Sequence, residues 1–331
     1  MTFKQYLEKL FQRLTLEQHE AHDMLVLLGT GQANAAQMAA FMTVYLMRAI
    51  TPNELAGFRT AMLDLCHKVE LDQESMDVCG TGGDGKDTFN ISTTAAFVVA
   101  GAGQLVAKHG NYGVSSTCGS STVMEALGYR FSNKADTIKR QADNANITFL
   151  HAPLFHPAMS YAGPVRQELG TKTFFNMLGP LVNPVLPKHQ LSGVFNLDLA
   201  RLYTYLLQKT DVNFGVIHGL DGYDEISLTG PAKYLSRGKE TLISPADFAF
   251  ETLNASILAA ESTPKDNAKR LIQILKNEAP ASDKKVVVAN AAVALLTSRK
   301  AETLLDAVDL ATISIESGRA YQCLQQLLMT A

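Results

Sequence analysis

Residues 77–93 read DVCGTGGDGKDTFNIST, a short apolar strand that runs into glycines and then into polar residues ahead of a helix. A glycine-rich turn between a strand and a helix is typical of a phosphate-binding loop in an α/β fold. Glycines allow backbone N–H groups to converge on an anion, and the first turn of the helix adds free N–H groups and the positive end of its dipole. We therefore expect this loop to bind an anion.

Two common nucleotide motifs match the loop only in part. Gly80, Gly82 and Gly85 have the dinucleotide spacing G-x-G-x-x-G, but residues 86–93 separate the last glycine from the apolar helix. The next strand also ends in lysine and histidine, where a dinucleotide fold requires Asp or Glu. The ATP-type loop G-x-x-x-x-G-K-[ST] would place its magnesium-binding hydroxyl at Asp87. The loop therefore fits neither class well.

The segments around the loop predict an α/β fold preceded by a helical region. Residues 1 to about 70 show only helical spacing of apolar residues, and Thr51-Pro52 is a typical helix start. After residue 76, short strands alternate with helices, which indicates a mostly parallel sheet. Besides the strand before the loop, the expected strands are LVAKHG (105–110), ITFL (147–150) and VNFGVIHG (212–219). The expected helices are 94–101, 120–127, 157–170 and several after about residue 265, with an irregular segment at 176–187.

A second loop with anion-binding character follows the second strand. Lys108 and His109 end that strand, and VSSTCGSS (114–121) supplies hydroxyls and a glycine before the next helix. Open α/β sheets bind ligands at the carboxyl ends of their strands. Two such loops on adjacent strands suggest a ligand with two separate phosphate groups, although tight turns with capping hydroxyls would give the same pattern.

Composition narrows the class of protein. The 331 residues are 47% hydrophobic and 18% charged with a formal net charge of −3, which argues against a nucleic-acid partner. The sequence has no apolar run of membrane-spanning length and no signal-peptide pattern. Its four cysteines are scattered, and His19 and His22 lack the spacing of a zinc motif. These features favour a protein of the reducing cytoplasm that binds neither zinc nor a membrane.

Seven motifs together resemble the anthranilate phosphoribosyltransferase family over nearly the whole chain. They are GTGGDG (80–85), TFNIST (88–93), KHGN (108–111), VSS (114–116), MEALG (124–128), VRQELGTKTFFNMLGPLVNP (165–184) and HGLDGYDEISLTGP (218–231). The resemblance implies transfer of a 5-phosphoribosyl group from phosphoribosyl pyrophosphate to the amine of anthranilate, in tryptophan biosynthesis. It also implies two Mg²⁺ ions per subunit, a cytoplasmic homodimer formed through the helical domain, and no covalent nucleophile.

The implied fold is of the nucleoside phosphorylase and phosphoribosyltransferase type, with a small all-helical domain packed on a larger α/β domain. The helical domain would be residues 1–70, joined in space by a helical segment at about 160–185. Residues 71–331 would form the α/β domain that binds phosphoribosyl pyrophosphate.

The resemblance also implies the residues of the site. Contacts to phosphoribosyl pyrophosphate would come from Gly80, Gly83, Asp84, Thr88, Asn90, Ile91, Ser92, Thr93, Lys108, His109, Gly110, Asn111, Tyr112, Gly113, Val114, Ser115, Ser116 and Ser120. Anthranilate would meet Gly80, Asn111 and Arg166, with His109 and His156 nearby. Ser92, Asp224 and Glu225 would bind the metal, because magnesium prefers carboxylate, hydroxyl and phosphate oxygens.

The sequence departs from the commonest family pattern near the second loop and at two later positions. The departures are Tyr112-Gly113, Thr117-Cys118, Ser121-Thr122, Lys172 and Tyr223. Two alternatives stay open: a pyrimidine nucleoside phosphorylase, which shares the fold, and a catalytically silent relative that binds phosphorylated ligands. The NIST run and the Asp224-Glu225 pair favour the transferase, since a phosphorylase needs no metal-bound diphosphate.

Overall fold

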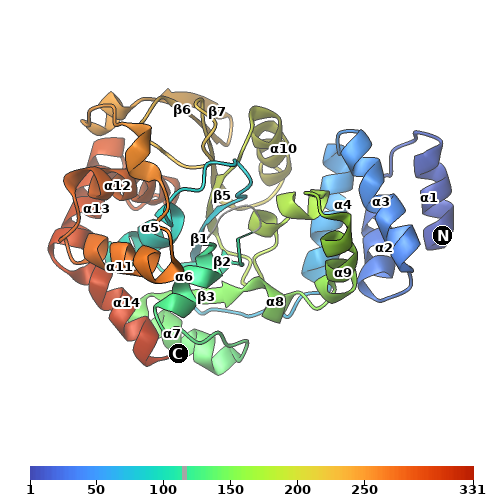
Figure 1. Ribbon diagram of the computed structural model, residues 1–331, viewed down its shortest axis with the longest axis horizontal. Helices are drawn as coiled ribbons and strands as arrows, with labels where there is room; N and C mark the ends of the chain where they lie inside the picture. The colour runs from blue at the N-terminus through green and yellow to red at the C-terminus, as the bar shows by residue number, and fades with distance from the viewer. Residues whose placement is uncertain (114–117) are drawn as a thin grey trace. The chain divides into compact units, whose positions relative to one another are not determined.

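The computed structural model describes residues 1–113 and 118–331, and its chain divides into two compact units. Figure 1 shows the elements of both. The first unit consists of Met1–Val69 and Ala152–Pro184, and the second of Glu70–His151 and Val185–Ala331.

The first unit is entirely helical. Its helices are α1 (Phe3–Phe11), α2 (Gln18–Gly29), α3 (Ala35–Met47), α4 (Pro52–Asp64), α8 (Ala152–Phe155) and α9 (Met159–Leu169), followed by the 3₁₀ turns η1 (Phe174–Met177) and η2 (Gly179–Leu181). Thr51 caps α4 and Pro52 occupies its first position, which confirms the predicted helix start. The segment expected to be irregular, residues 176–187, contains η2 and the last two residues of η1.

An aromatic cluster joins the two chain segments of the first unit. Phe174 of η1 stacks on Phe58 of α4 with ring centroids 4.7 Å apart, and meets Phe41 and Tyr45 of α3 edge-on at 5.3 and 5.2 Å. Each such pair adds about 0.5–1.5 kcal/mol beyond the burial of its area. Residues 152–184 are therefore part of the helical core.

The second unit contains one seven-stranded sheet of order β3-β2-β1-β4-β5-β6-β7. Its strands are β1 (Met76–Gly80), β2 (Val106–Gly110), β3 (Ile147–His151), β4 (His189–Gly193), β5 (Asn213–Gly219), β6 (Ala232–Ser236) and β7 (Lys239–Ile243). All neighbours from β3 to β5 pair in parallel, and β6 and β7 pair antiparallel. The predicted mostly parallel sheet is confirmed.

The strand order creates a switch point between β1 and β4. From β1 the chain crosses through α5 (Ile91–Gly101) to β2 on one side, and from β4 it crosses through α10 (Leu197–Leu207) to β5 on the other. Right-handed crossovers in opposite directions place the two helices on opposite faces, and Figure 1 shows α5 and α10 on either side of the strands. Ligands of open α/β sheets bind at the carboxyl ends of the strands beside such a switch point.

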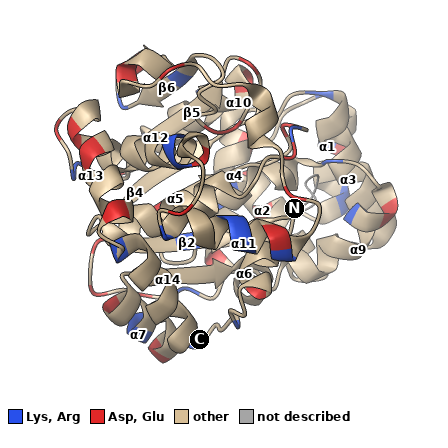
Figure 2. Ribbon diagram, turned by 60° about the vertical axis from the view of Figure 1, so that its left-hand side comes forward, with Lys and Arg blue, Asp and Glu red and all other residues tan. Residues whose placement is uncertain are grey.

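The remaining helices of the second unit cover the sheet and its edges. They are α6 (Ser120–Ala126), α7 (Ala135–Ala145), α11 (Pro264–Leu275), α12 (Ala281–Thr297), α13 (Leu304–Glu316) and α14 (Arg319–Met329), with the 3₁₀ turns η3 (Pro245–Phe248) and η4 (Ala255–Leu258). Figure 2 shows basic and acidic residues interspersed along these helices.

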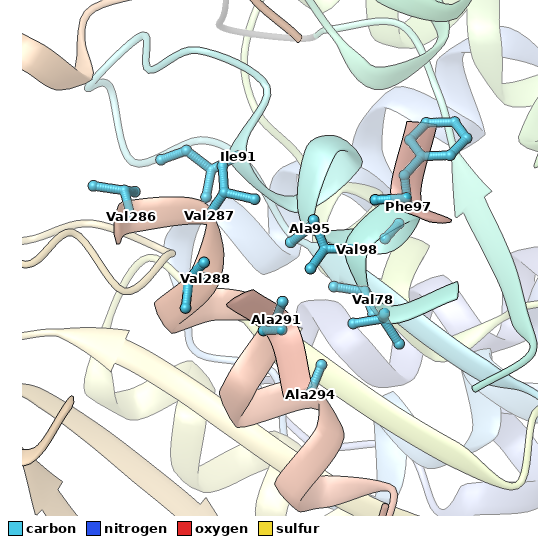
Figure 3. Packing of buried hydrophobic residues seen from close by; sticks show 14 of the residues in the cluster. Val78, Ile91, Ala95, Phe97, Val98, Val286, Val287, Val288, Ala291 and Ala294 are labelled. Carbon is cyan, nitrogen blue, oxygen red and sulfur yellow. The ribbon is translucent and has the colours of Figure 1, made fainter. Parts of the chain in front are cut away.

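The core of the second unit is centred on α5. This helix is buried along nearly its whole length, because it packs against β1 and β2 of the sheet and against α12, α13 and α14. Figure 3 shows Ile91, Ala95 and Val98 of α5 close to side chains of α12 such as Val287 and Ala291. The helix begins at Ile91 and not at Thr94 as expected, so its first turn includes the polar residues of the loop.

Across the described residues, every helix is too short or too polar to cross a membrane.

Candidate active site

The glycine-rich loop leaves the carboxyl end of β1 at the switch point. The Thr81 N–H donates to the Gly193 carbonyl at the end of β4. Gly82 and Gly83 then adopt left-handed φ values of 62° and 82°, which only glycine adopts without strain. This turn directs the Gly82 N–H to Oδ2 of Asp224 at 2.7 Å.

Asp224 and Glu225 lie in the turn between β5 and β6, which we call the acidic turn (residues 220–226). A Cβ on Gly193 would lie 1.7 Å from the Asp224 carbonyl, and one on Gly80 would lie 2.8 Å from Asp224 Oδ2. Glycines at the ends of β1 and β4 therefore make room for the acidic turn across the switch point.

The start of α5 faces the acidic turn. The Ser92 N–H donates to Oε1 of Glu225 at 3.2 Å. The Asn90 side chain does not cap the helix and instead donates to the Cys118 carbonyl at 2.8 Å. The polar first turn of α5 thus lies next to the acidic turn.

The electrostatics of the acidic turn favour a cation. Burial, then the neighbouring Asp84 carboxylate, raises the pKa of Asp224. Burial, then Asp224, raises the pKa of Glu225, while Lys108 and Ser92 act in the opposite direction. Like charges held together in a buried place are stabilised by a metal ion.

The donor set fits magnesium. Two carboxylates and the Ser92 hydroxyl are hard oxygen donors, and Mg²⁺ usually takes few protein ligands together with water and phosphate oxygens. Within residues 1–113 and 118–331, no group of three His, Cys, Asp or Glu side chains could hold a metal alone.

The second loop begins at the end of β2 and returns to α6. The Asn111 carbonyl accepts the Ser121 N–H at 3.1 Å, and the Asn111 N–H donates to Ser120 Oγ at 3.2 Å. Tyr112 points back along α6, where its hydroxyl donates to Glu125 at 2.7 Å. The side chain of Tyr112 thus ties residue 112 to α6.

Lys108 and His109 are both buried at the end of β2. The Lys108 Nζ donates to the Val78 carbonyl of β1, and the His109 N–H donates to Asp77. Lys108 therefore has a partner within the sheet, and its expected contact with a phosphate stays a prediction.

Arg166 and His156 belong to the first unit. Arg166 on α9 lies over the Phe175 ring at 5.4 Å, and its Nη2 reaches Asn176 Oδ1 at 3.5 Å. Burial lowers the pKa of His156 to about 4, so the folded protein holds this imidazole neutral at pH 7. Their predicted contacts with anthranilate remain untested.

The second unit brings together most of the predicted site residues. One group lies in the glycine-rich loop and the start of α5, next to Asp224 and Glu225: Gly80, Gly83, Asp84, Thr88, Asn90, Ile91, Ser92 and Thr93. The other group lies at the end of the neighbouring strand β2, in the loop after it and at the start of α6: Lys108, His109, Gly110, Asn111, Tyr112, Gly113 and Ser120. Val114, Ser115 and Ser116 lie outside the described residues.

Sequence reasoning missed two residues that support the acidic turn. Asn290 is buried on α12 and exchanges two hydrogen bonds of 2.9 Å with the backbone of Ile226. An amide within the apolar run VVVANAAVALL was the available signal, since buried polar groups need partners. Gly193, whose lack of a side chain makes room for the Asp224 carbonyl, shows no comparable pattern in the sequence.

His22 and the cysteines beside the two loops have ordinary structural roles. His22 pairs with Asp23 and Asp64 on the helices of the first unit. Burial raises the pKa of the Cys79 thiol, and burial raises the pKa of the Cys118 thiol to about 11, so both are poor nucleophiles.

Fold and site together define a glycosyl transferase. The helical bundle domain of the glycosyl transferase family matches residues 4–66, and its a/b domain matches residues 72–321. An anthranilate phosphoribosyltransferase of Cytophaga hutchinsonii is 50% identical over 98% of this chain and 99% of its own length, and that of Bacteroides thetaiotaomicron is 47% identical over 98% of both. The chain belongs to the anthranilate phosphoribosyltransferase family, which confirms the resemblance.

Solved structures of anthranilate phosphoribosyltransferases have the same fold as this chain. The anthranilate phosphoribosyltransferase of Thermus thermophilus superposes with a TM-score of 0.92 at 31% identity, covering 98% of both chains. The enzyme of Saccharomyces cerevisiae in complex with PRPP and Mg gives 0.91 at 28% identity, covering 99% of this chain and 97% of that one.

Proposed function

We propose that this chain transfers the 5-phosphoribosyl group of phosphoribosyl pyrophosphate to the amine of anthranilate, giving N-(5-phosphoribosyl)anthranilate and pyrophosphate, in tryptophan biosynthesis. One observation carries the proposal. Two N–H groups of the phosphate loop, those of Gly82 and Ser92, donate to Asp224 and Glu225 of the acidic turn. Phosphate-binding backbone and metal-binding carboxylates therefore share one place, as a metal-bound diphosphate requires.

Phosphoribosyl pyrophosphate would lie over the switch point in the second unit. The diphosphate would take the glycine-rich loop and the start of α5, and the second loop would hold the 5-phosphate. N–H donors at a helix start and hydroxyls suit both groups. The contacts would come from the residues that the family motifs imply: Gly80, Gly83, Asp84, Thr88 and residues 90–93 of the first loop, and residues 108–116 with Ser120 at the second.

Two Mg²⁺ ions would bind through Ser92, Asp224 and Glu225 together with diphosphate oxygens. Bound magnesium would neutralise the charge that grows on the leaving diphosphate. The relative from Saccharomyces cerevisiae, which was solved with PRPP and Mg, supports this assignment.

The chain's own residues would act by positioning. The C1–oxygen bond to pyrophosphate breaks, the C1–nitrogen bond forms, and the proton that the amine loses passes to the released pyrophosphate or to water. The aromatic amine is neutral at pH 7, so its lone pair needs no strong base to free it. N–H donors fixed by the loop would stabilise the departing diphosphate, and Arg166 would hold the carboxylate of anthranilate.

The active form would be a cytoplasmic homodimer formed through the helical unit. Four apolar residues at the ends of α1 and α3 are strongly exposed: Phe11, Leu14, Leu46 and Met47. These exposed apolar side chains are our reason for placing the interface on this unit. All four cysteines are free thiols, which fits a reducing compartment.

Product analysis tests the proposal. The purified protein is incubated with phosphoribosyl pyrophosphate, anthranilate and Mg²⁺, and separately with inorganic phosphate and uridine or thymidine. We expect phosphoribosylated anthranilate and pyrophosphate in equal amounts from the first mixture. Free pyrimidine base from the second mixture alone would identify a phosphorylase, and turnover of neither mixture would identify a silent relative.

A further inference from the structure

Arg270 is an inward-facing guanidinium that none of the steps above uses. It lies on α11 (orange in Figure 1), and 12% of its side chain is exposed. Its Nε pairs with Asp283 at 2.8 Å, and its Nη1 reaches Glu261 at 3.4 Å. The short pair with Asp283 is a charge-assisted hydrogen bond, which orients the guanidinium.

Those other contacts reach residues 257–260, the end of the 3₁₀ turn η4 and the two residues after it, which we call the strap. Arg270 Nη2 donates to the Ile257 carbonyl at 2.6 Å, and Nη1 donates to the Ala259 carbonyl at 2.8 Å. A guanidinium can bind alternate carbonyls in this way because its donors form a rigid planar fork.

The other edge of the strap pairs with the phosphate loop. The Phe89 N–H donates to the Leu258 carbonyl, and the Ala260 N–H donates to the Asp87 carbonyl, both at 2.9 Å. Arg270 also lies directly over the Phe89 ring, with Cζ 4.1 Å from the ring centroid. The guanidinium thus holds residues 87–89 twice, through the strap and through the aromatic ring.

Residues 87–89 lead straight into the start of α5. Asp87 has a left-handed φ of 46°, a conformation that a non-glycine residue keeps only where its surroundings enforce it. The next residues are Asn90, the N-cap of α5, and Ser92, whose N–H binds Glu225. The position of these donors therefore depends on what fixes residues 87–89.

We propose that Arg270 is a positioning residue for phosphoribosyl pyrophosphate: it fixes the strap and Phe89, and so holds the return half of the phosphate loop in register with the acidic turn. This inference rests on the proposed function of the loop. Arg270 itself touches neither substrate.

Arg237 offers a matched control in the same unit. It also donates to backbone carbonyls, those of Gln208, Thr210 and Val212, and lies over an aromatic ring, Phe214 at 5.8 Å. These contacts surround the amino end of β5, and the phosphate loops lie at carboxyl ends of the parallel strands. Arg237→Lys disturbs the same chemistry away from the site.

The test compares Arg270→Lys and Arg237→Lys with wild type. Lysine keeps the charge for Asp283 but cannot bind both strap carbonyls and cover Phe89. We expect the KM for phosphoribosyl pyrophosphate to rise roughly ten-fold in Arg270→Lys, because misplaced donors weaken binding and positioning. The KM for anthranilate should stay within about two-fold of wild type. Arg237→Lys should change neither constant.

Hydrogen exchange of the free protein supplies a readout that does not depend on substrate. Amides of residues 87–92 should exchange faster in Arg270→Lys, with the rest of the second unit unchanged. Exchange that rises everywhere, or faster local exchange with an unchanged KM for phosphoribosyl pyrophosphate, would overturn the positioning role. Phe89→Leu, which removes only the ring, should give a smaller rise in the same KM and serves if Arg270→Lys does not fold.

The two proposals fail differently. A wild type without transferase activity would overturn the proposed function, whereas the exchange data would still decide whether Arg270 fixes the loop.

Discussion

The Gly82 N–H binds Oδ2 of Asp224 at 2.7 Å, although 142 residues separate them in sequence. The glycine-rich loop and the acidic turn are therefore joined directly by a hydrogen bond within the chain. Ser92 makes the corresponding contact with Glu225. A diphosphate with its metal would enter a place whose donors and carboxylates already face each other.

A substitution at Lys108 tests whether the buried end of β2 contributes to binding of phosphoribosyl pyrophosphate. Its ammonium group binds the Val78 carbonyl and its charge lowers the pKa of Glu225, opposing the effect of burial. Lys108→Met should raise the KM for phosphoribosyl pyrophosphate roughly ten-fold or more if Lys108 binds a phosphate of this substrate as predicted, since a charge-assisted hydrogen bond contributes about 1.5–3 kcal/mol. The KM for anthranilate should change much less. Equal KM values for wild type and a folded Lys108→Met would leave this lysine a purely structural role.

Arg166 tests the anthranilate assignment in the first unit. A guanidinium fork matches a planar carboxylate with two parallel hydrogen bonds, and lysine keeps only the charge. Arg166→Ala should raise the KM for anthranilate, and Arg166→Lys should recover part of the loss, while the KM for phosphoribosyl pyrophosphate stays close to wild type. Steady-state kinetics with circular dichroism as the folding control measure this. An anthranilate KM unmoved in Arg166→Ala would reduce this arginine to its contacts with Phe175 and Asn176.

A substitution at Glu54 tests how the stability of the helical unit depends on pH. Its fully buried carboxylate accepts hydrogen bonds from Arg48, Tyr45 and the Leu16 N–H. Burial alone would raise the pKa of Glu54, but hydrogen bonds from Arg48 and from the Thr51 and Leu16 N–H groups, together with the charge of Arg48, hold it below its ordinary value of 4.5. The folded state therefore binds the proton more weakly than the unfolded state does. The resulting stability is present above about pH 4.5 and is lost as pH falls through the lowered folded-state pKa.

Thermal unfolding at pH 7 and at pH 3.5 measures the effect. Glu54→Gln should lose about 3 kcal/mol at pH 7, since it leaves Arg48 without its charge partner. The variant should also lose less stability than wild type on acidification. Glu8→Gln breaks the exposed pair with Lys4 and should change stability by under about 0.5 kcal/mol. Parallel acid profiles for wild type and Glu54→Gln would contradict the linkage.

Local sequence signals predicted the elements that bear the site. Thr51-Pro52 predicted the start of α4, and the alternation of strands and helices predicted the parallel part of the sheet. The antiparallel strands β6 and β7 were not predicted. The start of α5 was placed three residues late, because a polar stretch gives no apolar period even where it is helical.

Contacts between distant residues could not be predicted from local pattern. Nothing near Lys108 indicates that its amine turns to Val78, and nothing near Arg270 indicates that it lies over Phe89. Such pairs form only when the sheet order and the packing of α11 are known. Motif resemblance predicted the residues that would touch substrate, whereas the residues that hold them in place required the structure.

The most direct test of the account follows anthranilate fluorescence during turnover with phosphoribosyl pyrophosphate, over a range of Mg²⁺ concentrations. Wild type is compared with the double variant Asp224→Ala/Glu225→Ala, whose fold is checked by circular dichroism. The account predicts rapid loss of fluorescence that requires both phosphoribosyl pyrophosphate and Mg²⁺, and a turnover at least about a hundred-fold lower in the double variant, since metal stabilisation of the leaving group is worth several kcal/mol. Full activity of a folded double variant at low Mg²⁺, or wild-type turnover without the metal, would contradict it.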